Sequence, residues 1–210
     1  MNKLSNVTED PLQIFGRVHT WFHTRWLKHT YPFVGFGKGV SVHHSCDIPK
    51  WSASGIQLGE GTYLAQDVWL VVQPESTSQP PQIVIGKNCK LGRRSSIAAR
   101  NRVVLEDDVL LAPDVLIRDH NHEFSDIGRP IHAQGLTKGG RITIEKNCWL
   151  GCYVVLVCDA GELRIGRNSV IAANTVVTRS VPPFSVVAGN PAKIIKTYDQ
   201  AKGMWMKSQS

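Results

Sequence analysis

The sequence contains no uninterrupted apolar run long enough to cross a membrane, and hydrophobic residues make up only 42% of its 210 positions. This composition predicts no membrane-spanning helix. The N-terminus also lacks the basic, apolar and small-residue order of a secretory signal, because Glu9, Asp10 and Pro11 interrupt it. We therefore expect a cytoplasmic protein, and a chain of this length suffices for one well-buried main domain.

Cysteine is scarce, and its count of five is odd. Without an export signal, this number argues against a disulfide framework, so most of the thiols are expected to be small buried apolar groups. The formal net charge of +7 favours an anionic partner. Nucleic acid, an anionic membrane surface and a phosphate-bearing cofactor all meet that condition, and charge alone does not choose among them.

What the sequence does have is an internal period of six residues. An aliphatic residue is followed by a small or acidic residue, two polar residues and then a small or β-branched residue. The clearest run is residues 85–102, where hexads start at Ile85, Leu91 and Ile97. Further hexads start at Leu58, Leu64, Leu70, Leu105, Leu111, Ile117, Ile144, Leu150, Leu156, Ile165, Ile171 and Val177.

This period predicts an all-β fold in which residues 41–196 coil as a parallel β-helix. Each coil holds three hexads and about two further residues, since Ile85 and Leu105 are 20 positions apart. Short apolar strands alternating with Gly, Asn or Asp bends suit such a coil, whereas a six-residue spacing drifts around an α-helix. A β-sandwich or barrel with regular short strands is the alternative.

The period is interrupted twice. A turn-rich loop at residues 73–81 separates Leu58 from the hexad at Ile85, and a longer excursion at 118–140 precedes the hexad at Ile144. The longer loop contains His120 and His122. Loops on a rigid scaffold often carry chemistry, and histidine titrates in the range that general base catalysis needs.

Two other interpretations of these histidines stay open. They could be solvated loop side chains, or they could form an H-x-H metal pair whose third ligand would come from His132, His43 or His44.

The two ends of the chain fall outside the repeat. Within residues 1–40, the segment 14–28 has near-helical apolar spacing and predicts a short amphipathic helix that caps the first coil. Its mixture of aromatic and basic residues also suits a membrane surface, which is the alternative role. The tail at 197–210 shows little pattern and is expected to be loosely held.

Four stretches resemble the sugar O-acetyltransferases of the hexapeptide-repeat superfamily, which includes maltose, nodulation-factor, lipopolysaccharide and capsule acetyltransferases. The matching stretches are residues 119–135, 144–151, 171–179 and 187–193. The resemblance implies a left-handed coil and acetyl-CoA-dependent O-acetylation of a sugar hydroxyl by direct transfer. The implied acceptor is a cell-surface polysaccharide, such as lipopolysaccharide O-antigen, capsule or exopolysaccharide, or its precursor.

By this resemblance, one loop histidine removes the proton of the acceptor hydroxyl. His122 fits best because it lies ten positions beyond Ala112, which opens the matching stretch 112–115. His120 is the second candidate, and Asp119 or Glu123 would orient the imidazole.

The resemblance also implies a coenzyme A groove and a homotrimer in which the loop of one chain faces the groove of another. The small residues Gly151, Ala172 and Ala173 would admit the pantetheine arm, and Trp149 would form the wall of the groove. The phosphates would be contacted by Thr178, Arg179 and Lys193. No metal and no nucleic acid are expected.

Some relatives have an asparagine in the coil before the loop, where this chain has Arg93 or Arg94. This difference leaves room for an anionic or larger acceptor. The rival functions are a trimeric zinc lyase of the carbonic-anhydrase type and a non-enzymatic β-helical scaffold.

Overall fold

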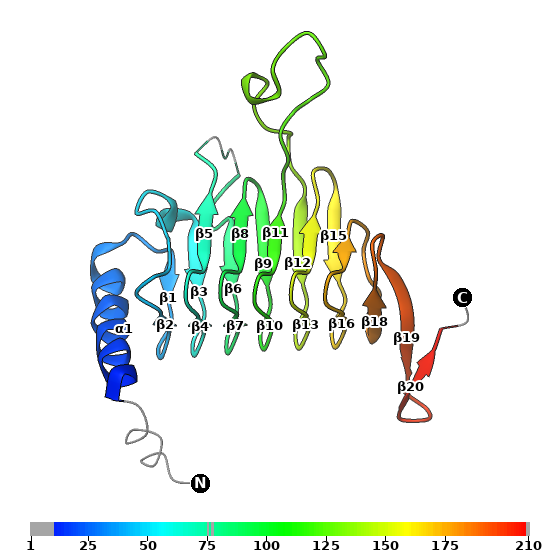
Figure 1. Ribbon diagram of the computed structural model, residues 1–210, viewed down its shortest axis with the longest axis horizontal. Coiled ribbons are helices and arrows are strands. Elements are labelled where there is room, and N and C mark those ends of the chain that lie inside the picture. The colour runs from blue at the N-terminus through cyan, green and yellow to red at the C-terminus, as the bar shows by residue number, and fades with distance from the viewer. Residues whose placement is uncertain (1–10, 75, 77, 209–210) are drawn as a thin grey trace.

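The computed structural model describes residues 11–74, 76 and 78–208. Its strands stack into a column of coils with a helix at one end and a long loop projecting from its side (Figure 1). Each full coil contributes one strand to each of three sheets, and neighbouring coils pair in parallel. The predicted parallel β-helix is therefore present.

The first sheet runs β1 (Gly35–Phe36), β3 (Ile56–Leu58), β6 (Ile83–Ile85), β9 (Arg102–Leu105), β12 (Arg141–Ile144) and β15 (Glu162–Ile165). The second begins with β2 (Ser41–Val42), β4 (Tyr63–Leu64), β7 (Lys90–Leu91), β10 (Leu110–Leu111), β13 (Trp149–Leu150), β16 (Val170–Ile171) and β18 (Ser185–Ala188). The third contains β5 (Trp69–Val72), β8 (Ser96–Ala99), β11 (Leu116–Arg118), β14 (Val155–Val157) and β17 (Val176–Val177). Two short 3-10 turns, η2 (Ser52–Gly55) and η3 (Ile131–Ala133), lie between strands.

The hexad starts form the core. In the first sheet, Ile85 pairs with Leu105, Leu105 with Ile144, and Ile144 with Ile165, and all four side chains are fully buried. The same stacking repeats in the other two sheets. Burial of each such side chain stabilises the fold by roughly 1.5–3 kcal/mol, so the period read from the sequence is also the main source of cohesion.

Asn and Asp occupy the tight bends between strands. Asn88, Asp108, Asn147 and Asn168 all have φ between 53° and 61°. Asn and Asp tolerate this left-handed conformation better than other residues with side chains, which explains the polar positions of the hexad.

Helix α1 (Pro11–Thr30) covers the open edge of the second sheet. The Thr24 hydroxyl donates to the carbonyl oxygen of Val42 (3.0 Å) and accepts from the Val42 N–H (2.9 Å). An exposed strand edge has unpaired groups of this kind, so the helix acts as a cap. Among the described residues, no helix combines the length and apolar character needed to cross a membrane.

Two sequence-based boundaries were wrong. The coils begin at Gly35 rather than residue 41, because β1 pairs in parallel with β3. Residues 197–208 are not loosely held: β19 (Lys193–Asp199) pairs antiparallel with β18 and with β20 (Met204–Lys207), extending the second sheet. Tyr198 and Trp205 pack edge to face with ring centroids 5.3 Å apart, a contact that the hexad pattern could not reveal.

Candidate functional site

The long loop is anchored firmly at its base. It occupies the residues between β11 and β12, and His122 and Leu136 form an antiparallel bridge across its neck. The guanidinium of Arg100, in the preceding coil, donates to the carbonyl oxygens of Leu136 (2.8 Å) and Thr137 (2.6 Å). The neck is thus held to the coils, and the tip extends away from them (Figure 1).

Asp119 is the first residue of the loop, and its side chain is fully buried. Its carboxylate accepts the backbone N–H groups of Arg100 (2.7 Å), Asn101 (2.8 Å) and Arg102 (2.8 Å). Three N–H donors hold the carboxylate in one orientation. The backbone of the preceding coil therefore fixes the position of this side chain.

His120 lies beside this carboxylate and is only 4% exposed. Its Nδ1 is 2.8 Å from Asp119 Oδ1, and its Nε2 is 3.0 Å from Nε2 of Gln73. Because a carboxylate can only accept, we assign the ring hydrogen to Nδ1. The lone pair of Nε2 then accepts from the Gln73 amide and is the basic site of the ring.

The structure does not give His122 a comparable setting. Its side chain is exposed, and its backbone forms the bridge in the loop neck. The carboxylate of Glu123 bonds to its own loop: its Oε1 accepts the N–H groups of Phe124 (3.0 Å) and Ser125 (3.2 Å). Hydrogen bonds from the side chain and N–H of Ser125, and then from the Phe124 N–H, lower the pKa of the Glu123 carboxyl.

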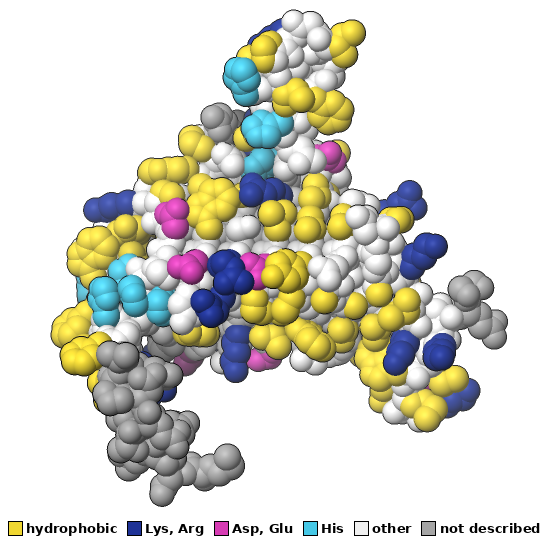
Figure 2. Space-filling model, viewed as in Figure 1, with side chains coloured by type: hydrophobic (Ala, Val, Ile, Leu, Met, Phe, Trp, Pro, Cys, Tyr) yellow, Lys and Arg dark blue, Asp and Glu magenta, His cyan; other side chains and the backbone are white. Residues whose placement is uncertain are grey.

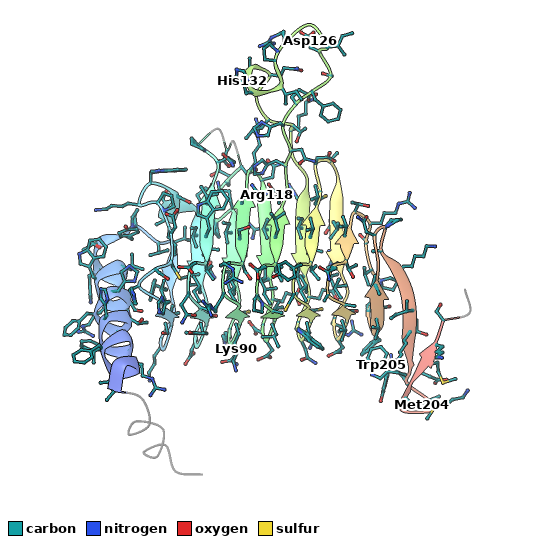
Figure 3. All side chains as sticks on the ribbon, viewed as in Figure 1. Lys90, Arg118, Asp126, His132, Met204 and Trp205 are labelled. Carbon is teal, nitrogen blue, oxygen red and sulfur yellow. The ribbon has the colours of Figure 1, made fainter. Side chains whose placement is uncertain are left out.

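Sequence reasoning missed Gln73, which contacts His120, and the pairing of Arg118 with Trp69 in the third sheet. Arg118 immediately precedes Asp119, and its guanidinium carbon lies 5.5 Å from the ring centroid of Trp69. Burial lowers the pKa of the Arg118 guanidinium, which is about half-buried. Figure 3 places Arg118 just below the loop neck. These contacts join separate coils, and nothing in the hexad pattern signals them.

The residues predicted to hold coenzyme A occupy two regions. Gly151, Ala172 and Ala173 stack at the bend after the second sheet, beside the half-exposed Trp149. A Cβ at Gly151 would come within 2.7 Å of the Ala173 nitrogen, so glycine is required there by coil stacking.

Lys193 begins β19 and pairs with Ala188 at the end of β18, so it lies at the same edge of the second sheet as Ala172. Thr178 and Arg179 lie elsewhere: they follow β17, two coils beyond His120 at the bend after the third sheet. The third sheet therefore separates His120 from the Gly151 bend within one chain.

The other candidate residues, Arg94, His43 and His44, have partners outside the loop. Arg94 pairs with Asp114 through contacts of 2.7 Å on the surface. His44 stacks on His19 of α1, and the ring of His43 packs against that of His44, away from the loop. Within residues 11–74, 76 and 78–208, no group of three or more His, Cys, Asp or Glu side chains is arranged to hold a metal ion.

The profile of the family described as "Hexapeptide repeat of succinyl-transferase" matches residues 82–112 and 141–179. The galactoside O-acetyltransferase of Escherichia coli (strain K12) is 41% identical over 81 residues, which cover 36% of this chain and 38% of that protein. The putative lipopolysaccharide biosynthesis O-acetyl transferase of the same strain is 35% identical over 98 residues, covering 44% of this chain and 48% of that protein. The chain thus spans less than half the length of these curated relatives, and the resemblance to hexapeptide-repeat acetyltransferases is confirmed over these segments.

Among solved structures, the N-acyltransferase AntD from Bacillus cereus, in complex with dTDP and 3-hydroxybutyryl-CoA, superposes with a TM-score of 0.67. The alignment covers 85% of this chain and 89% of that one at 16% identity. At this identity the likeness establishes a shared fold.

Proposed function

We propose that the protein transfers an acetyl group from acetyl-CoA to a hydroxyl group of a sugar. The observation that carries this proposal is the buried Asp119–His120 pair at the base of the loop, with Nδ1 and Oδ1 2.8 Å apart. The pair has the arrangement of a general base and the residue that orients it. The similarity to a galactoside and a lipopolysaccharide O-acetyltransferase supports a sugar acceptor.

In this reaction His120 acts as the base. The acceptor hydroxyl oxygen attacks the thioester carbonyl carbon while His120 Nε2 takes the hydroxyl proton. The new C–O bond forms as the carbonyl becomes a tetrahedral oxyanion, the C–S bond then breaks, and the proton passes from His120 to the departing thiolate. Asp119 keeps the hydrogen on Nδ1 and stabilises the imidazolium between these two proton transfers.

His120 suits this role better than His122, although position in the resembling stretch favoured His122. A base has to be held in one orientation, and His120 is held by Asp119 at Nδ1 and by Gln73 at Nε2. Gln73 holds Nε2 in the free protein, and the acceptor hydroxyl takes its place. His122 remains the second candidate.

The coenzyme would be held by Trp149, Gly151, Ala172 and Ala173 along the bend of the second sheet, with Thr178, Arg179 and Lys193 at the phosphates. Because the third sheet lies between this bend and His120 in one chain, we propose that a neighbouring chain supplies the groove. A homotrimer of left-handed coils meets this need. We further propose a cytoplasmic site of action and a cell-surface polysaccharide or its precursor as acceptor.

Thiol release from acetyl-CoA, measured against a panel of sugars and glycan fragments with hydroxyl or amino acceptor groups, tests the proposal. We expect release that depends on a hydroxyl acceptor and a product heavier by one acetyl group. Failure to bind acetyl-CoA would instead favour a scaffold, stoichiometric zinc with lyase activity would favour the zinc enzyme, and acetylation restricted to amines would exclude the O-transfer.

A further inference from the structure

Helix α1 presents an apolar stripe that is largely exposed in the described structure, although Trp26 packs edge to face on Tyr31. Phe15, Val18, Phe22 and Trp26 follow one another at three- and four-residue spacing, so they share one side of the helix. Phe15 is 75% exposed, Phe22 60% and Trp26 54%. The opposite side, with Thr20 and Leu27, is buried against the first coil.

The basic residues of α1 begin at the margin of this stripe with Arg25 and continue round the helix, through Lys28 and Arg17, toward the first two coils. Arg17, Arg25 and Lys28 line a groove of about 950 Å³ between α1 and the first two coils, together with Trp21. No carboxylate lines this groove within the described residues, and the sequence from 11 to 30 contains no Asp or Glu. The helix therefore combines aromatic side chains, permanent positive charge and a complete lack of acidic groups.

The position of α1 leaves this surface accessible. The helix lies at one end of the column, and its outer side points away from the coils (Figure 1; Figure 3). Hydrophobic side chains gather at that end of the molecule (Figure 2). A flat surface could contact the helix along its length, with the column extending away from it.

We propose that α1 docks the protein on an anionic lipid surface. Phe15, Phe22 and Trp26 enter the interface between headgroups and acyl chains, and Arg17, Arg25 and Lys28 contact the lipid phosphates. Interfacial helices have this pairing of an aromatic face with a basic edge. This inference is independent of the proposed acetyl transfer.

Charge argues for lipid rather than a second copy as the occupant. Two α1 helices packed face to face would bring like-charged edges together without a compensating carboxylate. An anionic surface instead neutralises Arg17, Arg25 and Lys28 while it covers the aromatic stripe.

Vesicle flotation tests the proposal with the full chain. Vesicles of phosphatidylcholine alone are compared with vesicles that also contain phosphatidylglycerol. We expect flotation only with the anionic vesicles, weakened by added salt. The affinity of the triple variant F15S/F22S/W26S for anionic vesicles should be lower by about tenfold or more. The affinity of R17Q/R25Q/K28Q should fall by about fivefold for each cation removed.

The matched control removes exposed apolar groups elsewhere. F124S/I127S/I131S changes side chains that are 66%, 103% and 55% exposed in the loop, and it should float as the wild type does. Circular dichroism and urea midpoints check that all variants remain folded. The proposal would be overturned if the protein did not float with anionic vesicles or floated equally with neutral ones. An equal loss of vesicle binding in the loop control would also overturn it. A lower solution mass of F15S/F22S/W26S by light scattering would also overturn it, because it would assign the stripe to a second copy.

Discussion

His120 donates its Nδ1 hydrogen to Oδ1 of Asp119 across 2.8 Å, and the carboxylate is in turn held by three backbone N–H groups of the preceding coil. The orientation of the imidazole is therefore set by the backbone of the coils, through Asp119. Such a chain of fixed contacts leaves Nε2 as the only ring atom able to take a proton.

The first prediction separates the two loop histidines. His120→Ala should lower kcat for acetyl transfer by about 10²–10⁴-fold, because it removes the general base. His122→Ala, at an exposed position in the same loop, should keep a rate close to the wild type. Thiol release under saturating acetyl-CoA measures both. The reverse pattern would return the catalytic role to His122.

The second prediction concerns the orienting carboxylate. Asp119→Asn places an amide among three N–H donors and the Nδ1–H, and a single amide oxygen cannot accept from all of them. Each buried group left unpaired costs about 1–3 kcal/mol, so the urea midpoint should fall together with kcat. Asp114→Asn is the matched control, since Asp114 pairs with Arg94 at the surface. An Asp119→Asn protein of unchanged stability and activity would contradict the assignment.

Gln73 supports a third prediction. Because its amide occupies Nε2 of His120 in the free protein, the acceptor has to displace it. Gln73→Ala should lower the KM for the acceptor by about 2–10-fold, the worth of one hydrogen bond, and leave kcat unchanged. Gln79→Ala, an exposed position in the same surface loop, is the control. A fall in kcat would mean that Gln73 contacts the acceptor during the reaction.

The buried thiols predict how stability changes in alkaline solution. Burial raises the pKa of Cys89 and of Cys148 from 9.0 to about 11. Between about pH 9 and pH 11 the unfolded chain releases these protons and the folded chain keeps them, so the free energy of unfolding falls as the pH rises. Each thiol contributes up to about 1.4 kcal/mol per pH unit.

Urea unfolding across this pH range measures the effect. The variant C89A/C148A should show a flatter pH dependence than the wild type, even if its stability at neutral pH is lower. Since tyrosine and lysine titration is common to both proteins, the difference between their slopes isolates the thiols. Identical slopes would show that these thiols do not couple to folding.

The β-helix could be predicted because every coil repeats the same contact. Ile85, Leu105 and Ile144 meet in register, so a six-residue period in the sequence translates directly into a stack of buried side chains. The start of the column escaped prediction, because β1 at Gly35–Phe36 pairs with β3 through backbone groups and carries no hexad. The hairpin of β19 and β20 escaped it for the same reason.

The sequence predicted the loop that carries the candidate site, but not which of its side chains contact one another. The interruption of the period located the loop and drew attention to His120 and His122. It did not distinguish them, since both are histidines within the same short stretch. Their difference lies in partners from other coils.

The amino-acid sequence by itself therefore determined the repeating coil, its buried aliphatic stack and the place where the chain leaves it, because these depend on local spacing and hydrophobic burial. Only the tertiary structure decided which histidine is held. The N–H groups of Arg100, Asn101 and Arg102 meet Asp119 across 17 to 19 residues, and the Gln73 amide reaches His120 across 47. Such contacts form only when coils stack, so the orientation of the base is a property of the stacked column.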